Sequence, residues 1–474
     1  MIKVATEAAQ VLIAKAYEAD QGHVLARWDE LDAGAQGKLL ATLKEIDFQQ
    51  LQHLIARCVK GSSGRKMGIA RPEPVEPLSP PRDDGERAAL RSIGQQALSR
   101  GEIAVVMAAG MRGSRIGLAG PEGLCPVGPI SQKPLYQLHA EQVAAINRRF
   151  RTETPFFVMT SAETDEATQE FFKANHFFTL PPRSVTFLRQ PRLPLVDRRG
   201  KIVMTSGSEI AMAPNGHGGA FLLLTAEEQL ERLRARGVKH VFYHQVNNPF
   251  VHIADPLFVG QHLWSDGEVS ARCVRKEEPD ERVGVFVRRG GQIAVIEYSE
   301  LSDAMRQARR EDGEGLRFNQ GNIAVHLLSL EFLERAARED LAPPYHLAKE
   351  RVPYLDRKGR RVQPAVSNCV RFECDIFDVF PLAKKVSLFE ADRAEEFYPV
   401  NTPRGPCSPE EVQRAMSERY AAWLARAGAA IPREDGGAPR GIYEISPLFA
   451  RDAEELEEKL DAAAFVPGDS LYLE

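Results

Sequence analysis

Three features are missing from this sequence, and each absence excludes a class of protein. No stretch approaches the roughly 20 apolar residues that a membrane span requires, so we expect no membrane partner. The net charge of −5 leaves no basic footprint for nucleic acid. The six cysteines show no CxxC spacing, which argues against a structural zinc. Because the first ten residues also lack a signal-peptide core, we expect reduced thiols and a cytoplasmic chain.

The size and composition of the chain do permit large hydrophobic cores. It has 474 residues, of which 43% are hydrophobic and 27% are charged, and this length suggests two or three domains. Because the net charge is negative, a polyanionic ligand would have to bind in a local pocket. Small phosphorylated ligands remain possible on these totals.

The most informative stretch is a valine-rich run that ends in glycines. The run from Ile103 to Met107 predicts a buried strand. Gly110, Gly113, Ser114 and Arg115 follow it directly. Glycines allow backbone N–H groups to approach an anion, and an arginine can direct two N–H donors at phosphate oxygens. The stretch predicts a phosphate-binding loop, although an ordinary turn after a core strand is the alternative.

Strands and helices alternate in the sequence that follows this loop. This order predicts an α/β protein with a parallel, doubly wound sheet. Ligands in that architecture lie at the carboxyl ends of the strands. The expected strands are 103–107, 156–160 and 185–188, the helices are 134–149 and 165–175, and the polar segments at that edge are Ser161, Gln190, 213–219 and 240–248.

Changes in composition divide the chain into three parts. Residues 1–84 combine a helical segment with a proline-rich connector, residues 85–390 form the central domain, and residues 391–474 form a small C-terminal lobe. Within them we expect a helix capped by Asp47, a hairpin turn at 289–291, alternating strand-like residues at 376–390, a helix capped by Ser408 and an acidic helix at 452–460.

Several further polar side chains have a functional and a structural interpretation. Asp375 and Asp378 could form a carboxylate pair, but their apolar neighbours favour a strand edge. The histidines at 139, 176, 240, 244 and 252 show no metal-ligand spacing beyond His240 and His244. That pair lies in a strand-like segment, where residues four apart do not converge on one ion as they do on a helix.

A set of motifs spread along the chain resembles one known family. The chain is similar to the UDP-sugar pyrophosphorylases, above all to the UDP-N-acetylglucosamine pyrophosphorylase branch, over about residues 15 to 450. The motifs include AAGMRGSRIG (108–117), RQPRLPLVDRRGKI (189–202), MAPNGHGGAF (212–221), QVNNPFVHIADP (245–256), RFNQGNIAVH (317–326) and FECDIFDVFPLAKK (372–385).

The resemblance implies a fold, a reaction and a set of site residues. The fold would be a Rossmann-like, GT-A-like nucleotidyltransferase domain. The reaction would convert UTP and a hexose or N-acetylhexosamine 1-phosphate into a UDP-sugar, such as UDP-glucose or UDP-N-acetylglucosamine, and pyrophosphate, with Mg²⁺ as cofactor. By the resemblance, Gly110, Gly113, Ser114, Gln190 and Gly218 bind the nucleotide, Gly284, Glu297 and Asn322 bind the sugar, Arg115 and Lys384 are catalytic, and Asn247 occupies the metal position.

The sequence departs from the family pattern at positions where the family binds phosphate and metal. Glu122 replaces a lysine, Asn247 replaces an aspartate, and Asn401 stands near a phosphate-binding lysine. The loop also has two residues, Met111 and Arg112, where the family has one.

Two hypotheses follow from these departures. In one, the chain is an active transferase in which Lys133, Arg112 or the pair Lys384–Lys385 supplies the missing positive charge, and Glu122 or a substrate oxygen helps to hold the metal. In the other, it is a catalytically impaired paralogue that binds sugar nucleotides as a sensor. The sequence leaves the sugar and the oligomeric state open.

Overall fold

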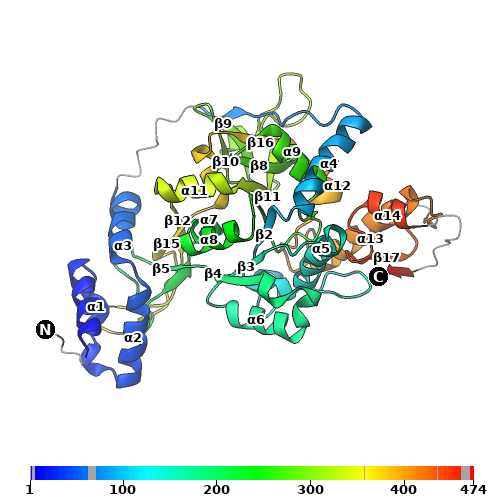
Figure 1. The fold of residues 1–474 in the computed structure, drawn as a ribbon. Coiled ribbons are helices and arrows are strands. Elements are labelled where there is room, and N and C mark those ends of the chain that lie inside the picture. The colour runs from blue at the N-terminus through cyan, green and yellow to red at the C-terminus, as the bar shows by residue number, and fades with distance from the viewer. Residues whose placement is uncertain (1, 3–5, 62–70, 357, 435, 461–469) are drawn as a thin grey trace. The chain divides into compact units, whose positions relative to one another are not determined.

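A computed structural model describes residues 2, 6–61, 71–356, 358–434, 436–460 and 470–474 (Figure 1). The chain forms two compact units. The first comprises residues 1–70, 190–219 and 342–378, and the second comprises residues 71–189, 220–341 and 379–474. No helix among the described residues is both long and apolar enough to cross a membrane.

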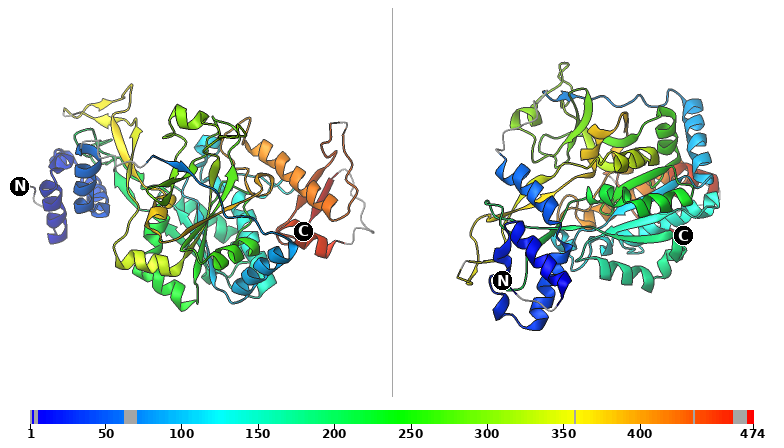
Figure 2. Two further views of the ribbon diagram at one scale, coloured as in Figure 1. Left: turned by 90° about the horizontal axis from the view of Figure 1, so that it is seen from above. Right: turned by 60° about the vertical axis from the view of Figure 1, so that its left-hand side comes forward.

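The first unit combines N-terminal helices with short β-ribbons. Helices α1, α2 and α3 pack together around Leu39, Leu43 and Leu51 (blue in Figures 1 and 2). Asp47 caps α3 by accepting backbone N–H bonds, as the sequence predicted. Its elements are α1 (Glu7–Glu18), η1 (Gly22–Leu25), η2 (Trp28–Glu30), α2 (Ala33–Glu45), α3 (Phe48–Leu54), η3 (Ile55–Lys60), β5 (Arg192–Pro194), β6 (Met212–Pro214), β12 (His346–Glu350), β13 (Tyr354–Leu355), β14 (Arg361–Val362) and β15 (Cys369–Glu373).

The second unit contains the central sheet, its helices and a C-terminal group. Its strands are β1 (Glu73–Pro74), β2 (Ile103–Ala108), β3 (Phe156–Thr160), β4 (Val185–Arg189), β7 (His240–Gln245), β8 (Val269–Arg275), β9 (Val285–Arg289), β10 (Gln292–Ile296), β11 (Gln320–Ser329), β16 (Val386–Glu390), β17 (Ile442–Ile445) and β18 (Ser470–Leu473).

The helices of the second unit fall between these strands. They are α4 (Asp84–Ser99), η4 (Gly113–Ile116), η5 (Glu122–Leu124), α5 (Leu135–Phe150), α6 (Asp165–Ala174), η6 (His176–Thr179), η7 (Pro182–Ser184), α8 (Glu227–Ala235), α9 (Pro256–Ser265), α10 (Asp303–Gln307), α11 (Leu330–Arg338), α12 (Arg393–Glu396), α13 (Pro409–Arg426) and α14 (Ala453–Lys459). Two more contain residues of both units, α7 (Gly219–Leu224) and η8 (Ile376–Leu382).

The central sheet is mixed and mainly parallel around its middle. Its main path runs β1-β9-β11-β7-β2-β3-β4. Strands β7, β2, β3 and β4 are parallel, and β11 pairs antiparallel to β7. All six residues of β2 are buried between β7 and β3, which explains its continuous apolar run. The α/β class and the strands expected at 103–107, 156–160 and 185–188 are confirmed.

The hairpin expected in the second half of the chain is also present. Strands β9 and β10 are joined through Gly290 and Gly291, both of which have positive φ, as this tight turn requires. The strand-like pattern expected over 376–390 is only half right. Residues 376–382 form the 3₁₀ helix η8 around Pro381, which has no backbone N–H to donate to a strand, and β16 begins at Val386.

Helices α4 and α9 lie unusually close together. A Cβ at Gly94 of α4 would overlap the carbonyl oxygen of Pro256, and one at Gly260 of α9 would overlap that of Leu90. The two backbones are therefore in direct contact at this crossing, which no larger residue would permit.

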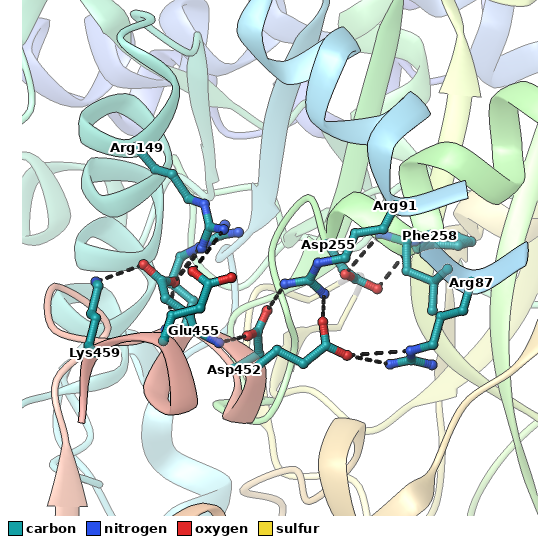
Figure 3. Close-up of polar contacts among 12 residues, drawn as sticks. Arg87, Arg91, Arg149, Asp255, Phe258, Asp452, Glu455 and Lys459 are labelled. Atoms are coloured by element: carbon teal, nitrogen blue, oxygen red, sulfur yellow. Dashed lines mark hydrogen bonds and ion pairs between the residues drawn. The ribbon is translucent and has the colours of Figure 1, made fainter. Parts of the chain in front are cut away.

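The C-terminal group consists of α13, β17, α14 and β18 (orange to red in Figure 2). Ser408 caps α13, as the sequence predicted. The acidic helix expected at 452–460 is α14, and Asp452 is its N-cap. Asp452 also forms an ion pair with Arg91 of α4, with Oδ2 2.9 Å from Nη2 (Figure 3). Nη1 of Arg149, on α5, lies 3.3 Å from Oε2 of Glu455. These ion pairs tie α14 to helices that lie more than 300 residues earlier in the sequence.

Candidate active site

The glycine-rich segment follows β2 as expected, at the carboxyl edge of the sheet. Gly113 begins the short helix η4, and Ser114 and Arg115 are exposed on it. The side chains of Met111 and Arg112, the two residues between Gly110 and Gly113, are both exposed. The backbone N–H of Gly113 donates to the Gly120 carbonyl at 2.8 Å, so the segment presents the exposed polar side chains of Ser114 and Arg115 where the sequence predicted an anion site.

Arg115 is held in place by the residue that replaces the family's lysine. Its Nε and Nη2 both donate to Oε1 of Glu122, at 3.1 and 2.8 Å. The Glu122 side chain is only 1% exposed, whereas that of Arg115 is 37% exposed. Burial raises the pKa of Glu122, and the charge of Arg115 opposes that rise without cancelling it. Glu122 therefore lies behind the arginine, and Nη1 of Arg115 makes no contact with it.

The end of β7 lies beside the loop. Ala108 of β2 pairs with Gln245 of β7, so the two parallel strands end at the same edge. Asn247 donates from Nδ2 to Oδ1 of Asn401 at 3.0 Å, and its carbonyl accepts from the Val400 amide at 2.8 Å. The two asparagines at departing positions are therefore hydrogen-bonded to each other.

These residues do not fit a protein-held magnesium ion. Mg²⁺ is usually bound through one or two carboxylates together with substrate phosphates. Asn247 offers only a neutral amide oxygen, and Oδ1 of Asn248 already accepts N–H bonds from Phe250 and Tyr398. The nearby carboxylate of Glu396 is buried against Arg272. The strand end therefore supplies no carboxylate to a cation among the residues that the structure describes here.

Two lysines considered as sources of positive charge are placed elsewhere. Lys133 is bound by Glu141 at 2.9 Å and by Glu474 at 3.0 Å, which raises its pKa despite burial. Lys384 precedes β16, and its backbone N–H donates to Glu268, the residue before β8. Since β8 and β16 run in the same direction as β2 and β7, these residues lie at the amino edge of the sheet. A five-residue strand is about 16 Å long, and this length separates the amino edge of the sheet from the loop at its carboxyl edge. Lys384 therefore does not reach the loop.

The three residues expected at the sugar lie together in the second unit. A Cβ at Gly284 would lie 2.7 Å from Oε1 of Glu297, so the carboxylate rests directly over this glycine. The Gly284 carbonyl accepts from the Asn322 amide at 2.8 Å. Asn322 precedes a β-bulge in β11, where Ala324 has a positive φ, and this irregularity positions the asparagine.

The two residues expected at the uracil lie together in the first unit. Gln190 donates from its side-chain amide to the carbonyl of Gly216. Gly218 donates to the Cys374 carbonyl at 2.8 Å, and a Cβ on it would lie 2.8 Å from that carbonyl. Only glycine therefore fits at Gly218. Gln190 is therefore hydrogen-bonded to the loop that carries Gly218.

Sequence reasoning missed two polar residues in these segments. Asn215 is 1% exposed, and its buried Oδ1 has no hydrogen-bond partner among the described residues. Asn248 fixes the chain after β7 by bonding to the Glu396 carbonyl through Nδ2. Both lie inside quoted motifs, PNGHGG and QVNN, but the motifs alone do not distinguish a ligand-facing amide from a structural one.

Comparison with known proteins agrees with this geometry. A family model described as UTP--glucose-1-phosphate uridylyltransferase matches residues 48–403. The chain is 35% identical to human UDP-N-acetylhexosamine pyrophosphorylase-like protein 1, with 95% of each chain covered. It is 30% identical to UDP-N-acetylglucosamine pyrophosphorylase of Saccharomyces cerevisiae, covering 93% of this chain and 95% of that one.

Solved structures give the same result. The uridine diphosphate N-acetylglucosamine pyrophosphorylase of Trypanosoma brucei matches with a TM-score of 0.82 and 25% identity, over 100% of this chain and 99% of that one. A putative UDP-N-acetylglucosamine pyrophosphorylase of Entamoeba histolytica matches with a TM-score of 0.72 and 30% identity, over 84% of this chain and 98% of that one. The family match, the relatives and the loop after β2 agree, and the chain belongs to the UTP–glucose-1-phosphate uridylyltransferase family.

Proposed function

We propose that this chain is a uridylyltransferase that makes a UDP-sugar and pyrophosphate from UTP and a sugar 1-phosphate. The observation that carries the proposal is the meeting of Gly284, Glu297 and Asn322, the three residues that the resemblance assigns to the sugar. A carboxylate and an amide beside a glycine can bind sugar hydroxyls without steric obstruction.

The chemical step requires charge neutralisation more than covalent assistance. An oxygen of the sugar phosphate forms a bond to the α-phosphorus of UTP. The bond from that phosphorus to the bridging oxygen breaks, and pyrophosphate leaves with the electron pair. We assign the neutralising charge to Arg112 and Arg115, because Lys133 is already paired and Lys384 lies at the other edge of the sheet.

We further propose that the sugar is an N-acetylhexosamine. The relatives described above are named for N-acetylhexosamine or N-acetylglucosamine. A hexose 1-phosphate is the alternative substrate. Mg²⁺ and the cytoplasm stay predictions from the sequence, and no step here depends on an ion held by Asn247.

The test is pyrophosphate release from UTP with N-acetylglucosamine 1-phosphate, N-acetylgalactosamine 1-phosphate and glucose 1-phosphate in parallel. We expect turnover with at least one N-acetylhexosamine phosphate, and slower turnover with glucose 1-phosphate. Binding of UDP-N-acetylglucosamine by calorimetry, without turnover in either direction, would refute the transferase and support a sugar-nucleotide sensor. Binding of neither UTP nor a UDP-sugar would refute both.

A further inference from the structure

A second group of metal-ligating side chains lies in the first unit, where β15 ends. Strands β12 and β15 are antiparallel, and His346 at the start of β12 pairs with Glu373 at the end of β15. The chain then turns through Asp375 into η8, which carries Asp378. The sequence interpretation of the two aspartates as a strand edge is wrong, because the strand has already ended and the turn directs both towards His346.

The geometry of this group suits a single ion. One ligand atom from each of His346, Asp375 and Asp378 lies within 4.8 Å of the others. Nε2 of His346 is 2.9 Å from Oδ2 of Asp378. Ligand atoms around a tetrahedral ion with bonds of about 2.1 Å are separated by about 3.4 Å, so side-chain rotations alone would close the site.

A second histidine orients one of the carboxylates. The Ile376 backbone N–H donates to Nδ1 of His217 at 3.2 Å, so the ring carries its proton on Nε2. That Nε2–H lies 3.0 Å from Oδ1 of Asp375. Carboxylates that bind metal ions in proteins are usually held by hydrogen bonds of this kind.

The two carboxylates of the group form their ion pairs with histidine. Among the ion pairs of the described residues, Asp375 and Asp378 have only histidine partners. Arg371 is nearby in sequence, but its guanidinium is bound by Glu350 at 3.1 Å and by Glu373 at 2.9 Å. With both imidazoles neutral, the group carries two negative charges.

Cys374 lies between the ligands in sequence but does not join them. Its Sγ donates to the Asn215 carbonyl at 3.3 Å, so the thiol is directed at the backbone of another segment. The His346 side chain is 39% exposed and that of Asp378 is 12% exposed. An ion therefore has access to the group, and water can complete its coordination.

We propose that His346, Asp375 and Asp378 bind one divalent transition-metal ion such as Zn²⁺ or Mn²⁺, with His217 as a positioning residue. One imidazole and two carboxylates form a mixed N/O set, which suits these ions better than Mg²⁺. The bound ion would join the start of β12 to the turn after β15. That turn contacts Gly216 and Gly218 through Cys374, so the ion would also stiffen the loop that carries Gly218.

The first test is direct binding to the whole purified chain. After treatment with a chelator, calorimetry with Zn²⁺ and Mn²⁺ should show one site per chain, and Mg²⁺ should bind much more weakly. Co²⁺ should give the visible absorption of a low-symmetry N/O site. A thiolate-to-cobalt charge-transfer band would assign the ion to a cysteine and overturn the proposal, as would the absence of Zn²⁺ and Mn²⁺ binding.

The second test separates the ligands from other carboxylates of the same unit. We expect Asp375→Asn and His346→Gln to abolish the site, and His217→Gln to weaken metal affinity by roughly 10- to 100-fold. Asp356→Asn is the matched control, because this carboxylate lies in the first unit and pairs with Arg360 at 2.7 Å. Unchanged metal affinity in correctly folded Asp375→Asn and His346→Gln would show that the group is only two histidine–aspartate pairs. None of these readouts requires uridylyl transfer, so failure here is distinguishable from failure of the proposed function.

Discussion

Replacing Glu122 by glutamine should strengthen UTP binding. The carboxylate is held 2.8 Å from Nη2 of Arg115, on the buried side of the guanidinium. A phosphate oxygen bound on the other side would lie roughly 6 to 8 Å from it. At an effective dielectric constant of about 20, one pair of unit charges at 8 Å repels by about 2 kcal/mol. Since the Arg115 side chain is 37% exposed, we expect about 1 to 2 kcal/mol, or 5- to 30-fold in Kd.

The assay is calorimetry with UTP at fixed ionic strength on the wild type and Glu122→Gln. Glutamine keeps an oxygen that can accept from Arg115, so the loop should hold its shape. Glu102→Gln is the matched control. Glu102 is also buried and paired, with Arg100 at 2.9 Å and Lys239 at 2.7 Å, but it precedes β2 at the opposite edge of the sheet. The control variant should leave UTP affinity unchanged.

Weaker UTP binding in Glu122→Gln would refute this reasoning. It would mean that the carboxylate is needed to aim the guanidinium and that repulsion of phosphate is the smaller effect. An equal gain in Glu102→Gln would also refute it, because the effect would then come from net charge alone.

Three further changes test other parts of the structure. The double variant Asn247→Asp with Asn401→Lys replaces an amide pair by an ion pair and adds a carboxylate. Mg²⁺ should therefore stimulate pyrophosphate release more strongly in this variant than in the wild type. An unchanged dependence of the rate on Mg²⁺ concentration would contradict this. Glu297→Gln should raise KM for the sugar 1-phosphate about tenfold and leave UTP affinity unchanged, as steady-state kinetics and calorimetry can measure. Burial raises the pKa of Asp452, but Arg91 and an N–H bond outweigh it and hold that pKa at about 2, against 3.8 when unfolded. The ionised Asp452 side chain therefore stabilises the fold fully above pH 4, and this stabilisation is lost as pH falls towards 2. Asp452→Asn should lower the free energy of unfolding by about 2 kcal/mol at pH 7 and by much less near pH 2. Urea titrations at both pH values can measure this difference.

The sequence predicted best where local pattern and tertiary structure coincide. A run of buried residues such as Ile103–Ala108 has no alternative to a central strand, and the pair Gly290–Gly291 permits a turn that few other residues can form. The capping roles of Asp47 and Ser408 were equally readable, because a cap depends on neighbours within three residues.

Prediction failed where partners are distant in sequence. Asn247 and Asn401 are 154 residues apart, so nothing in either motif shows that the two departures meet in one hydrogen bond. Lys384 was a reasonable source of positive charge until the direction of β16 placed it at the amino edge of the sheet. Glu122 was expected to face phosphate, and only its burial behind Arg115 shows that it faces inward.

The contact between α4 and α9 limits how this chain can vary. Gly94 and Gly260 each fill a space that even one methyl group would exceed, so a saturation library should return almost no tolerated substitution at either position. Helix α4 also carries Arg91, which holds Asp452 at the start of α14. Relatives or engineered versions that reposition the C-terminal group must therefore change the arginine contacts, because the helix that presents them has no freedom to slide.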